Sequence, residues 1–289
     1  MKISTSMDHA LKIDKVSPRE AAKMMKRVGF DGIDLALCHD MTDPATILTP
    51  SWADHVYADA EAALAEGLEI AQCHLPYHCP QDTVEEYAEI WSEALFHSIK
   101  IAHEAGAKTA VIHPVTNIGD PEGTHKGNVK FFKTFVPYLE KYDMNLAIEN
   151  VFIRRNARNM ESYLGSAPEL MAIVNEVGCD RIGTCFDTGH ANIYRHKWGP
   201  MAREFGKKLF ALHVNSNCST IDEHLIPGII LPWCEKMSYD DFYVALKEIE
   251  FPGFFNMEIS STVLPKGCGE AYLTIAAAVA RQMADQVKL

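Results

Sequence analysis

Eight short apolar runs, separated by helical patterns, limit the fold of this chain more than any other feature. The runs lie near residues 2–7, 32–37, 70–76, 109–114, 145–150, 182–188, 209–215 and 254–260. Runs of this length are typical of strands buried in a parallel sheet, which helices must connect. With no linker rich in Pro, Gly or Ser in 289 residues, this alternation predicts one α/β domain over residues 1–289, a (β/α)8 TIM barrel. A doubly wound open sheet is the alternative.

Several helix starts are marked by capping signals. Ser17-Pro18-Arg19-Glu20 has the pattern of a capping box with proline at the first helical position. The stretches 166–169 and 238–241 open two later helices in a similar way. The sequence predicts its longest helix over 83–105 and an Ala-rich final helix over 268–286.

Four of the later runs end in a side chain that binds metal ions, namely Glu149, Asp187, His213 and Glu258. A carboxylate or imidazole at the end of a buried strand is costly unless something neutralises or binds it. Because barrel strands present their C-terminal ends at one rim, we expect these four side chains to meet there. A divalent cation held by two Glu, one Asp and one His explains them best.

Composition excludes several classes of protein. The formal net charge is −12, and no block of Lys and Arg stands out, which argues against a surface for duplex nucleic acid. The first residues lack the apolar stretch of a signal peptide, and no segment has the length of a membrane span. The eight cysteines contain no Cys-x-x-Cys pair, so we expect reduced thiols in a cytoplasmic protein.

Five motifs resemble those of the xylose-isomerase-like barrel superfamily: Ile-Glu149-Asn, Phe-Asp187-Thr-Gly-His190, His213-Val-Asn, Asp222-Glu-His224 and Met-Glu258. That superfamily includes sugar and sugar-phosphate isomerases and epimerases, and also endonuclease IV. The resemblance implies that one divalent ion (Mn²⁺, Mg²⁺, Co²⁺ or Zn²⁺) is held by Glu149, Asp187, His213 and Glu258. In the epimerase-like members the catalytic acid and base match Glu149 and Glu258.

Such a site supports chemistry on a small carbohydrate. A cation bound to adjacent oxygens of a hydroxy-ketone acidifies the neighbouring C–H bond, and an enediolate forms. Two carboxylates can then remove a proton from one face and return it to the other. Six further residues are expected to contact the substrate: His74, His113, His190, Asp222, His224 and Arg154. We expect no nucleic acid and no membrane as partners and leave a homo-oligomer open.

Two other functions remain alternatives. His74, His113, His190 and the Asp222-x-His224 pair also match the extra ligands of the three-zinc endonuclease type. A nuclease should present cationic side chains along a phosphate track, and the loop over 216–221 has none, so we favour the sugar enzyme with one ion. The third candidate is a barrel that binds sugar without catalysis. Whether Lys266-Gly-Cys-Gly269 binds a phosphate stays open.

Overall fold

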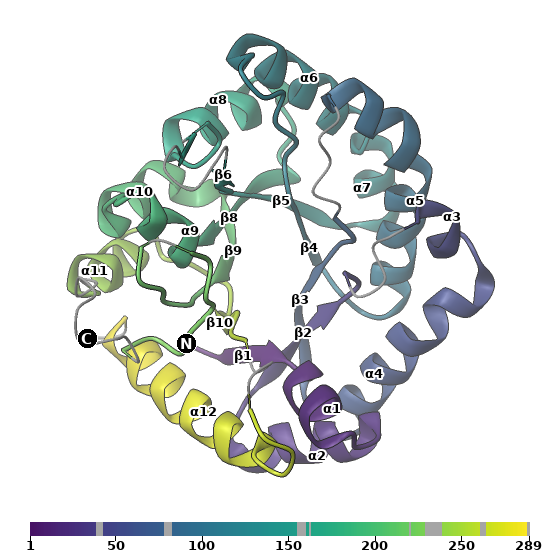
Figure 1. Ribbon diagram of the computed structural model, residues 1–289, viewed down its shortest axis with the longest axis vertical. Coiled ribbons are helices and arrows are strands. Elements are labelled where there is room, and N and C mark those ends of the chain that lie inside the picture. The colour runs from purple at the N-terminus through teal and green to yellow at the C-terminus, as the bar shows by residue number, and fades with distance from the viewer. Residues whose placement is uncertain are drawn as a thin grey trace.

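Eight parallel strands form the centre of the molecule, and helices surround them in a ring (Figure 1). The computed structural model describes residues 1–38, 43–77, 83–154, 160–161, 163–219, 221–228, 239–260 and 264–287. The strands of the sheet are β1 (Ile3–Ser6), β2 (Gly32–Ala36), β3 (Glu69–His74), β4 (Thr109–Ile112), β5 (Asn145–Glu149), β8 (Ile182–Asp187), β9 (Leu209–His213) and β10 (Phe255–Met257).

The sheet closes on itself. Its order is β10-β1-β2-β3-β4-β5-β8-β9, and every pairing within it is parallel. A parallel bridge between Val214 and Met257 joins the two ends of the sheet, and the Val214 amide donates to the Asn256 carbonyl at 2.8 Å. The (β/α)8 prediction is therefore confirmed, and the open-sheet alternative is wrong.

The helices occupy the connections that the sequence patterns indicated. They are α1 (Asp8–Asp14), α2 (Pro18–Val28), α3 (Pro44–Ile47), α4 (Ala53–Ala65), α5 (Val84–Glu104), α6 (Pro121–Lys133), α7 (Val136–Tyr142), α8 (Ala167–Val177), α9 (Thr188–Ile193), α10 (Trp198–Phe205), α11 (Asp240–Glu248) and α12 (Gly269–Gln286). Short 3-10 turns lie at Pro50–Trp52 and Gly206–Lys208. A small antiparallel hairpin pairs β6 (Ile153–Arg154) with β7 (Met160–Glu161). None of the described helices is long and apolar enough to cross a membrane.

The predicted capping boxes form. The Glu20 amide donates to the Ser17 hydroxyl at 3.3 Å, and the Ser17 amide donates to the Glu20 carboxylate at 3.1 Å. At the start of α8 the Ser166 amide donates to the Glu169 carboxylate at 3.2 Å. The expected cap of α11 is not testable in this way, because Ser238 lies outside the described residues. Helices α5 and α12 match the predicted stretches to within one residue at each end.

The alternation of side chains along the strands creates two layers inside the barrel. A small buried cluster of Val111, Ala147, Cys185 and Ala211 comes from four neighbouring strands and is separate from the main hydrophobic core. Two positions further along the same strands, and therefore on the same face, stand His113, Glu149, Asp187 and His213. The barrel is thus filled by small apolar side chains at mid-height and by ionisable side chains at its C-terminal rim.

One cysteine differs from the expectation of reduced thiols. Cys218 is disulfide-bonded, so the prediction is wrong for this residue. The described free thiols are Cys38, Cys73, Cys179, Cys185 and Cys268, and Cys79 and Cys234 lie outside the described residues. A disulfide depends on which cysteines the fold brings within about 7 Å. Spacing along the sequence does not reveal that proximity.

Gly183 offers a test of how closely β8 and β9 pack. A Cβ atom at Gly183 would lie 2.3 Å from the Lys208 carbonyl oxygen and 2.6 Å from the Phe210 ring. Because the nearest atom belongs to the backbone, relief requires a shift of the strand itself. We expect Gly183→Ala to destabilise the protein by about 1–3 kcal/mol, measured by chemical unfolding. Val244→Ala, at a side chain that is 49% exposed, is the control and should change stability little. A Gly183→Ala variant with the same stability as the parent would contradict this close packing of β8 against β9.

Candidate metal centre

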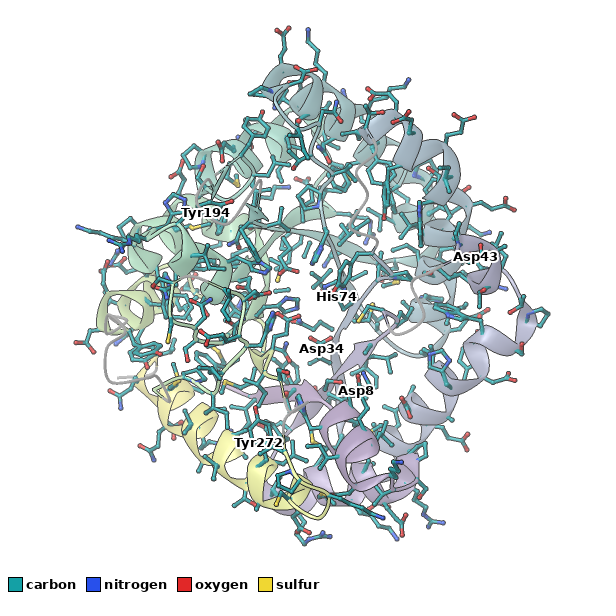
Figure 2. The ribbon with its side chains drawn as sticks, viewed as in Figure 1. Asp8, Asp34, Asp43, His74, Tyr194 and Tyr272 are labelled. Carbon is teal, nitrogen blue, oxygen red and sulfur yellow. The ribbon has the colours of Figure 1, made fainter. Side chains whose placement is uncertain are left out.

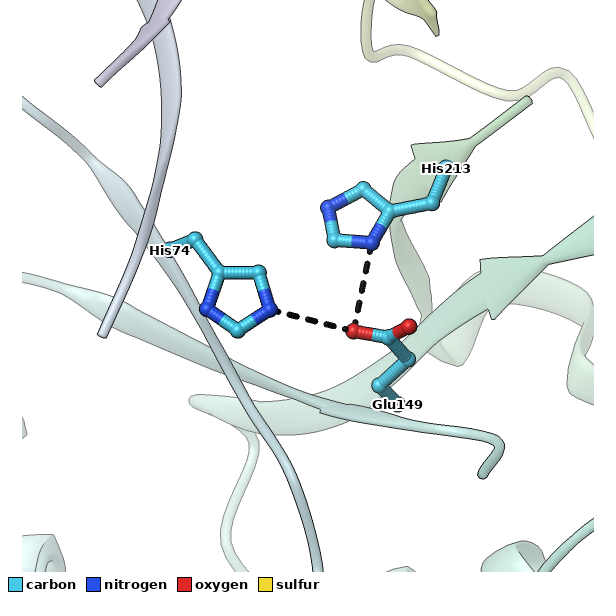
Figure 3. Close-up of side chains that lie close together, drawn as sticks. All are labelled: His74, Glu149 and His213. Atoms are coloured by element: carbon cyan, nitrogen blue, oxygen red, sulfur yellow. Dashed lines mark ion pairs between the residues drawn. The ribbon is translucent and has the colours of Figure 1, made fainter. Parts of the chain in front are cut away.

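Glu149 lies at the centre of the rim, surrounded by four imidazoles. Its Oε2 atom is 3.5 Å from His74 Nε2 and 3.2 Å from His213 Nδ1 (Figure 3). The same atom is 3.4 Å from His113 Nε2. Its Oε1 atom is 3.2 Å from His190 Nδ1. The carboxylate is fully buried, yet neither of its oxygens makes a hydrogen bond of good geometry. The structure therefore brings together side chains from four strands and one following helix around a single buried charge.

The four predicted ligands form one compact group. Their ligand atoms, on Glu149, Asp187, His213 and Glu258, all lie within 4.8 Å of one another. His213 Nδ1 is 3.2 Å from an oxygen of both Glu149 and Glu258. Both ring nitrogens of His213 and Oε2 of Glu258 also lack a hydrogen-bond partner. Leaving so many buried polar atoms unpaired is costly, and a divalent cation would take up Nδ1 of His213 together with the carboxylate oxygens that face it. The residues present fit such an ion.

Neighbouring polar groups hold Asp187 in place. Its Oδ1 atom accepts from the His190 amide at 2.6 Å, which caps α9, and its Oδ2 atom accepts from the Asn215 side chain at 2.7 Å. The Asp187 backbone amide donates to Asn150 Oδ1 at 2.7 Å, and Asn150 Nδ2 donates to the Asp187 carbonyl at 2.9 Å. Such outer contacts fix the direction of a metal-binding carboxylate.

The carboxylates and imidazoles of the group shift one another's pKa in opposite directions. Burial lowers the pKa of His213, but Cys185, Glu258 and Glu149 outweigh it, and the pKa stands well above the usual value. Burial raises the pKa of Glu149, but His213 and His113 outweigh it and hold that pKa well below normal. Burial raises the pKa of Asp187 to about 8. A cation bound here would take over the role of the protons on the imidazoles.

A second group of possible ligands lies beside the first. The ligand atoms of His190, Asp222 and His224 are also within 4.8 Å of one another. Here the facing atoms already have partners, because Asp222 Oδ2 lies 2.7 Å from His224 Nε2 and 3.3 Å from His190 Nε2. His224 Nδ1 lies 3.5 Å from Glu258 Oε2, which joins the two groups. A third combination, of His74, Glu149 and His213, shares two residues with the first group.

Nearly all of the predicted site residues therefore meet at the rim. They are His74, His113, Glu149, Asp187, His190, His213, Asp222, His224 and Glu258. The exception is Arg154, whose backbone lies in β6 and whose side chain is outside the described part of the structure.

Asp34 is a residue of this site that the sequence analysis missed. It is 7% exposed, and its Oδ2 atom lies 3.6 Å from His213 Nε2. The same oxygen accepts from Gln72 at 2.9 Å and from Asn256 at 2.7 Å, while Oδ1 lacks a partner. An acid inside the apolar run of β2 was the available signal.

Comparison with known proteins places this geometry in a family. The chain belongs to the xylose isomerase-like TIM barrel family, which matches residues 22–281. An uncharacterised protein of Methanocaldococcus jannaschii is 25% identical over 226 residues, which cover 73% of this chain and 70% of that protein.

Solved structures share the barrel over its whole length. A D-tagatose 3-epimerase-like protein superposes with a TM-score of 0.73 at 18% identity, covering 100% of both chains. The 3-keto-D-glucoside 4-epimerase of E. coli gives 0.72 at 15% identity, covering 98% of this chain and 99% of its own. An L-ribulose 3-epimerase gives 0.72 at 15% identity, covering 99% and 95%. At these identities the likeness shows the fold.

Asn215 allows a test of the ligand arrangement. Because its amide holds Asp187 Oδ2, we expect Asn215→Ala to weaken binding of a divalent ion by about 10–100-fold. Competition with a chelator measures the affinity. Asn192→Ala is the matched control, since the Asn192 amide bonds Asn217 and Ser219 rather than a ligand. A folded Asn215→Ala variant with the parent's affinity would show that Asp187 is not a ligand.

Proposed function

We propose that this chain is a divalent-metal-dependent sugar isomerase or epimerase. The observation that carries the proposal is the pair of carboxylates, Glu149 and Glu258, whose unpaired oxygens approach the same His213 nitrogen at 3.2 Å. Glu149 ends β5 and Glu258 follows β10, so the two acids reach the rim from separate parts of the barrel. A substrate between them would meet one acid on each side.

The chemistry follows from this placement. A divalent ion at Glu149, Asp187, His213 and Glu258 would polarise the carbonyl of a hydroxy-ketone and acidify the adjacent C–H bond. Glu149 and Glu258 would then remove a proton from one face of that carbon and return one to the other. The imidazoles of His74, His113, His190 and His224 and the Asp222 carboxylate would contact the substrate hydroxyls. Mn²⁺, Mg²⁺, Co²⁺ and Zn²⁺ are the ions that this donor set accepts.

Membership of the family and the names of the structural relatives support a carbohydrate substrate. Several of those relatives are sugar epimerases, including enzymes solved with D-fructose, D-tagatose and D-allulose. A single catalytic domain over 1–289 is part of the same proposal. The paired acids disfavour a barrel that only binds sugar, because binding alone needs no second base. Binding of ketoses without exchange of solvent deuterium into carbon would favour that alternative.

Replacement of either acid tests the proposal. Glu149→Gln and Glu258→Gln each remove a base and a candidate ligand, so we expect turnover to fall by at least about 10²–10⁴-fold. Interconversion of D-tagatose, D-psicose, D-fructose and L-ribulose is measured by chromatography, and deuterium uptake by mass spectrometry. Glu250→Gln is the control, because Glu250 pairs with Lys207 at the surface. Full activity in either site variant would reject the assignment.

A second candidate function is a zinc phosphodiesterase of the endonuclease IV kind. The observation in its favour is the group of His190, Asp222 and His224, which lies directly beside the first group and could hold another ion. Against it stands the internal pairing of that group, since Asp222 already contacts both imidazoles. Of the ligand atoms in the two groups, most of the unpaired ones lie on Glu149, His213 and Glu258, and one, Oδ1, lies on Asp222; this distribution favours one tightly bound ion at the first group.

The number of bound ions separates the two functions. We expect elemental analysis of protein purified without chelator to give about one ion per chain. Asp187→Asn should lose that ion, whereas His224→Ala should keep it, because Asp187 belongs to the unpaired group and His224 to the paired one. A value near three, lost stepwise on replacing His74, His113 and His224, would reject the single ion. Specific incision of an abasic-site duplex would then establish the phosphodiesterase.

A further inference from the structure

A cavity beside the candidate metal site extends toward β1 and α1, the first elements of the chain. Its volume is about 220 Å³, and Asp34, His74, His224 and Glu258 line both the cavity and the rim site. The other wall comes from the end of β1 and the first turns of α1. Figure 2 shows Asp8, Asp34 and His74 in succession from α1 toward the barrel centre. The residues contributed by β1 and α1 are Ser6, Asp8, His9 and Lys12.

In this wall Asp8 is a hydrogen-bond acceptor and Lys12 is a donor, and the two side chains contact each other. Asp8 is the first residue of α1, and its side chain is 16% exposed. Lys12 lies one turn later, with Nζ 3.2 Å from Asp8 Oδ2 and a side chain that is 60% exposed. His9 beneath them is buried, and burial lowers its pKa to about 4, so it is neutral at physiological pH. The ammonium of Lys12 is therefore balanced by its own neighbour.

The lining offers both acceptors and donors to hydroxyl groups. Among the described lining residues, Asp8, Asp34 and Glu258 are acids, Lys12 is the one Lys or Arg, and His9, His74 and His224 contribute imidazoles. Oδ1 of Asp34 is buried and has no hydrogen-bond partner among the described residues, so it could accept from a ligand hydroxyl. A phosphate would face these acids at short range, with one cation that is already paired. Sugar hydroxyls, in contrast, donate to carboxylates and accept from an ammonium.

The backbone amides before α12, where this fold often binds phosphate, also have a partner within the chain. In many (β/α)8 barrels a phosphate occupies backbone amides before a late helix. Here Asp14 Oδ1 accepts from the Gly267 amide at 2.7 Å and from the Gly269 amide at 3.4 Å. A carboxylate of the chain thus accepts from two of the backbone amides in the segment Lys266-Gly-Cys-Gly269 before α12. The sequence left the role of this segment open, and the structure gives these two amides a partner in Asp14.

We propose that Asp8, with Lys12, is a specificity-determining pair that binds the hydroxyl groups at the non-reacting end of an unphosphorylated polyhydroxy-ketone. The Asp8 carboxylate accepts from one hydroxyl, the Lys12 ammonium donates to its neighbour, and Asp34 accepts a third. The same acids repel the phosphate ester of that ketone. This inference rests on the proposed isomerase or epimerase function and adds the chemical class of its substrate.

The test compares each free ketose with its terminal phosphate ester in the metal-loaded enzyme. The parent should have a kcat/KM at least about 10-fold higher for the free sugar. Asp8→Ser should raise KM for the free sugar about 10-fold and change kcat little. The ratio of kcat/KM for the free sugar to that for the phosphate ester should fall, and the metal content should stay the same. Lys12→Gln, at an exposed side chain, should raise KM in the same way. Asp54→Asn, on the exposed face of α4, is the control.

The outcomes separate this inference from the proposed function. An unchanged KM in both Asp8→Ser and Lys12→Gln, or a parent that prefers the ester, would overturn the pair's role while leaving the isomerase intact. If no ketose is turned over, calorimetry with a non-reacting linear polyol decides. If the polyol binds the parent and its affinity falls about 10-fold in Asp8→Ser, the cavity is a sugar-binding site and the catalytic proposal is rejected. No binding of the polyol by the metal-loaded parent would overturn the pocket as well.

Discussion

The buried carboxylate of Glu149 is the constraint on which the rest of the rim depends. A charge with no exposed surface must be compensated inside the barrel, and four imidazoles lie within 3.5 Å of it. Those imidazoles come from β3, the end of β4, α9 and β9, so their strands must end at the same height. The parallel register of β5 with β4 and β8 provides this alignment. The closed sheet and the ionisable cluster are therefore parts of one arrangement.

The period of two along each strand explains why so much was predictable. Ala147 and Glu149 share a face of β5, as Cys185 and Asp187 share a face of β8. A small residue followed two positions later by an ionisable one therefore marks an inward-facing strand end. The sequence prediction used the apolar runs that end in an ionisable residue and the helical patterns between them, and these were sufficient for the barrel and the four candidate ligands. They depend on local periodicity alone, which needs no knowledge of tertiary contacts.

What remained unpredicted depends on contacts between distant segments. Asp34 lies within β2 rather than at its end, and its role follows from Gln72 and Asn256, which are far away in sequence. The helix α1 is short and follows β1 after one residue, so its side chains face the cavity without a long periodic pattern. The contact of Asp14 with Gly267 joins opposite ends of the chain.

The charge of the whole chain and the charge of the cavity favour the same kind of ligand. With a formal net charge of −12, the protein has a long-range field that slows the approach of an anion and leaves a neutral sugar unaffected. Near the rim, Asp8 and Asp34 add negative charge beyond that of the four-residue group. A divalent ion would offset the carboxylates that hold it. The proposed Asp8–Lys12 subsite would therefore favour a substrate that binds through hydroxyl groups over its phosphate ester.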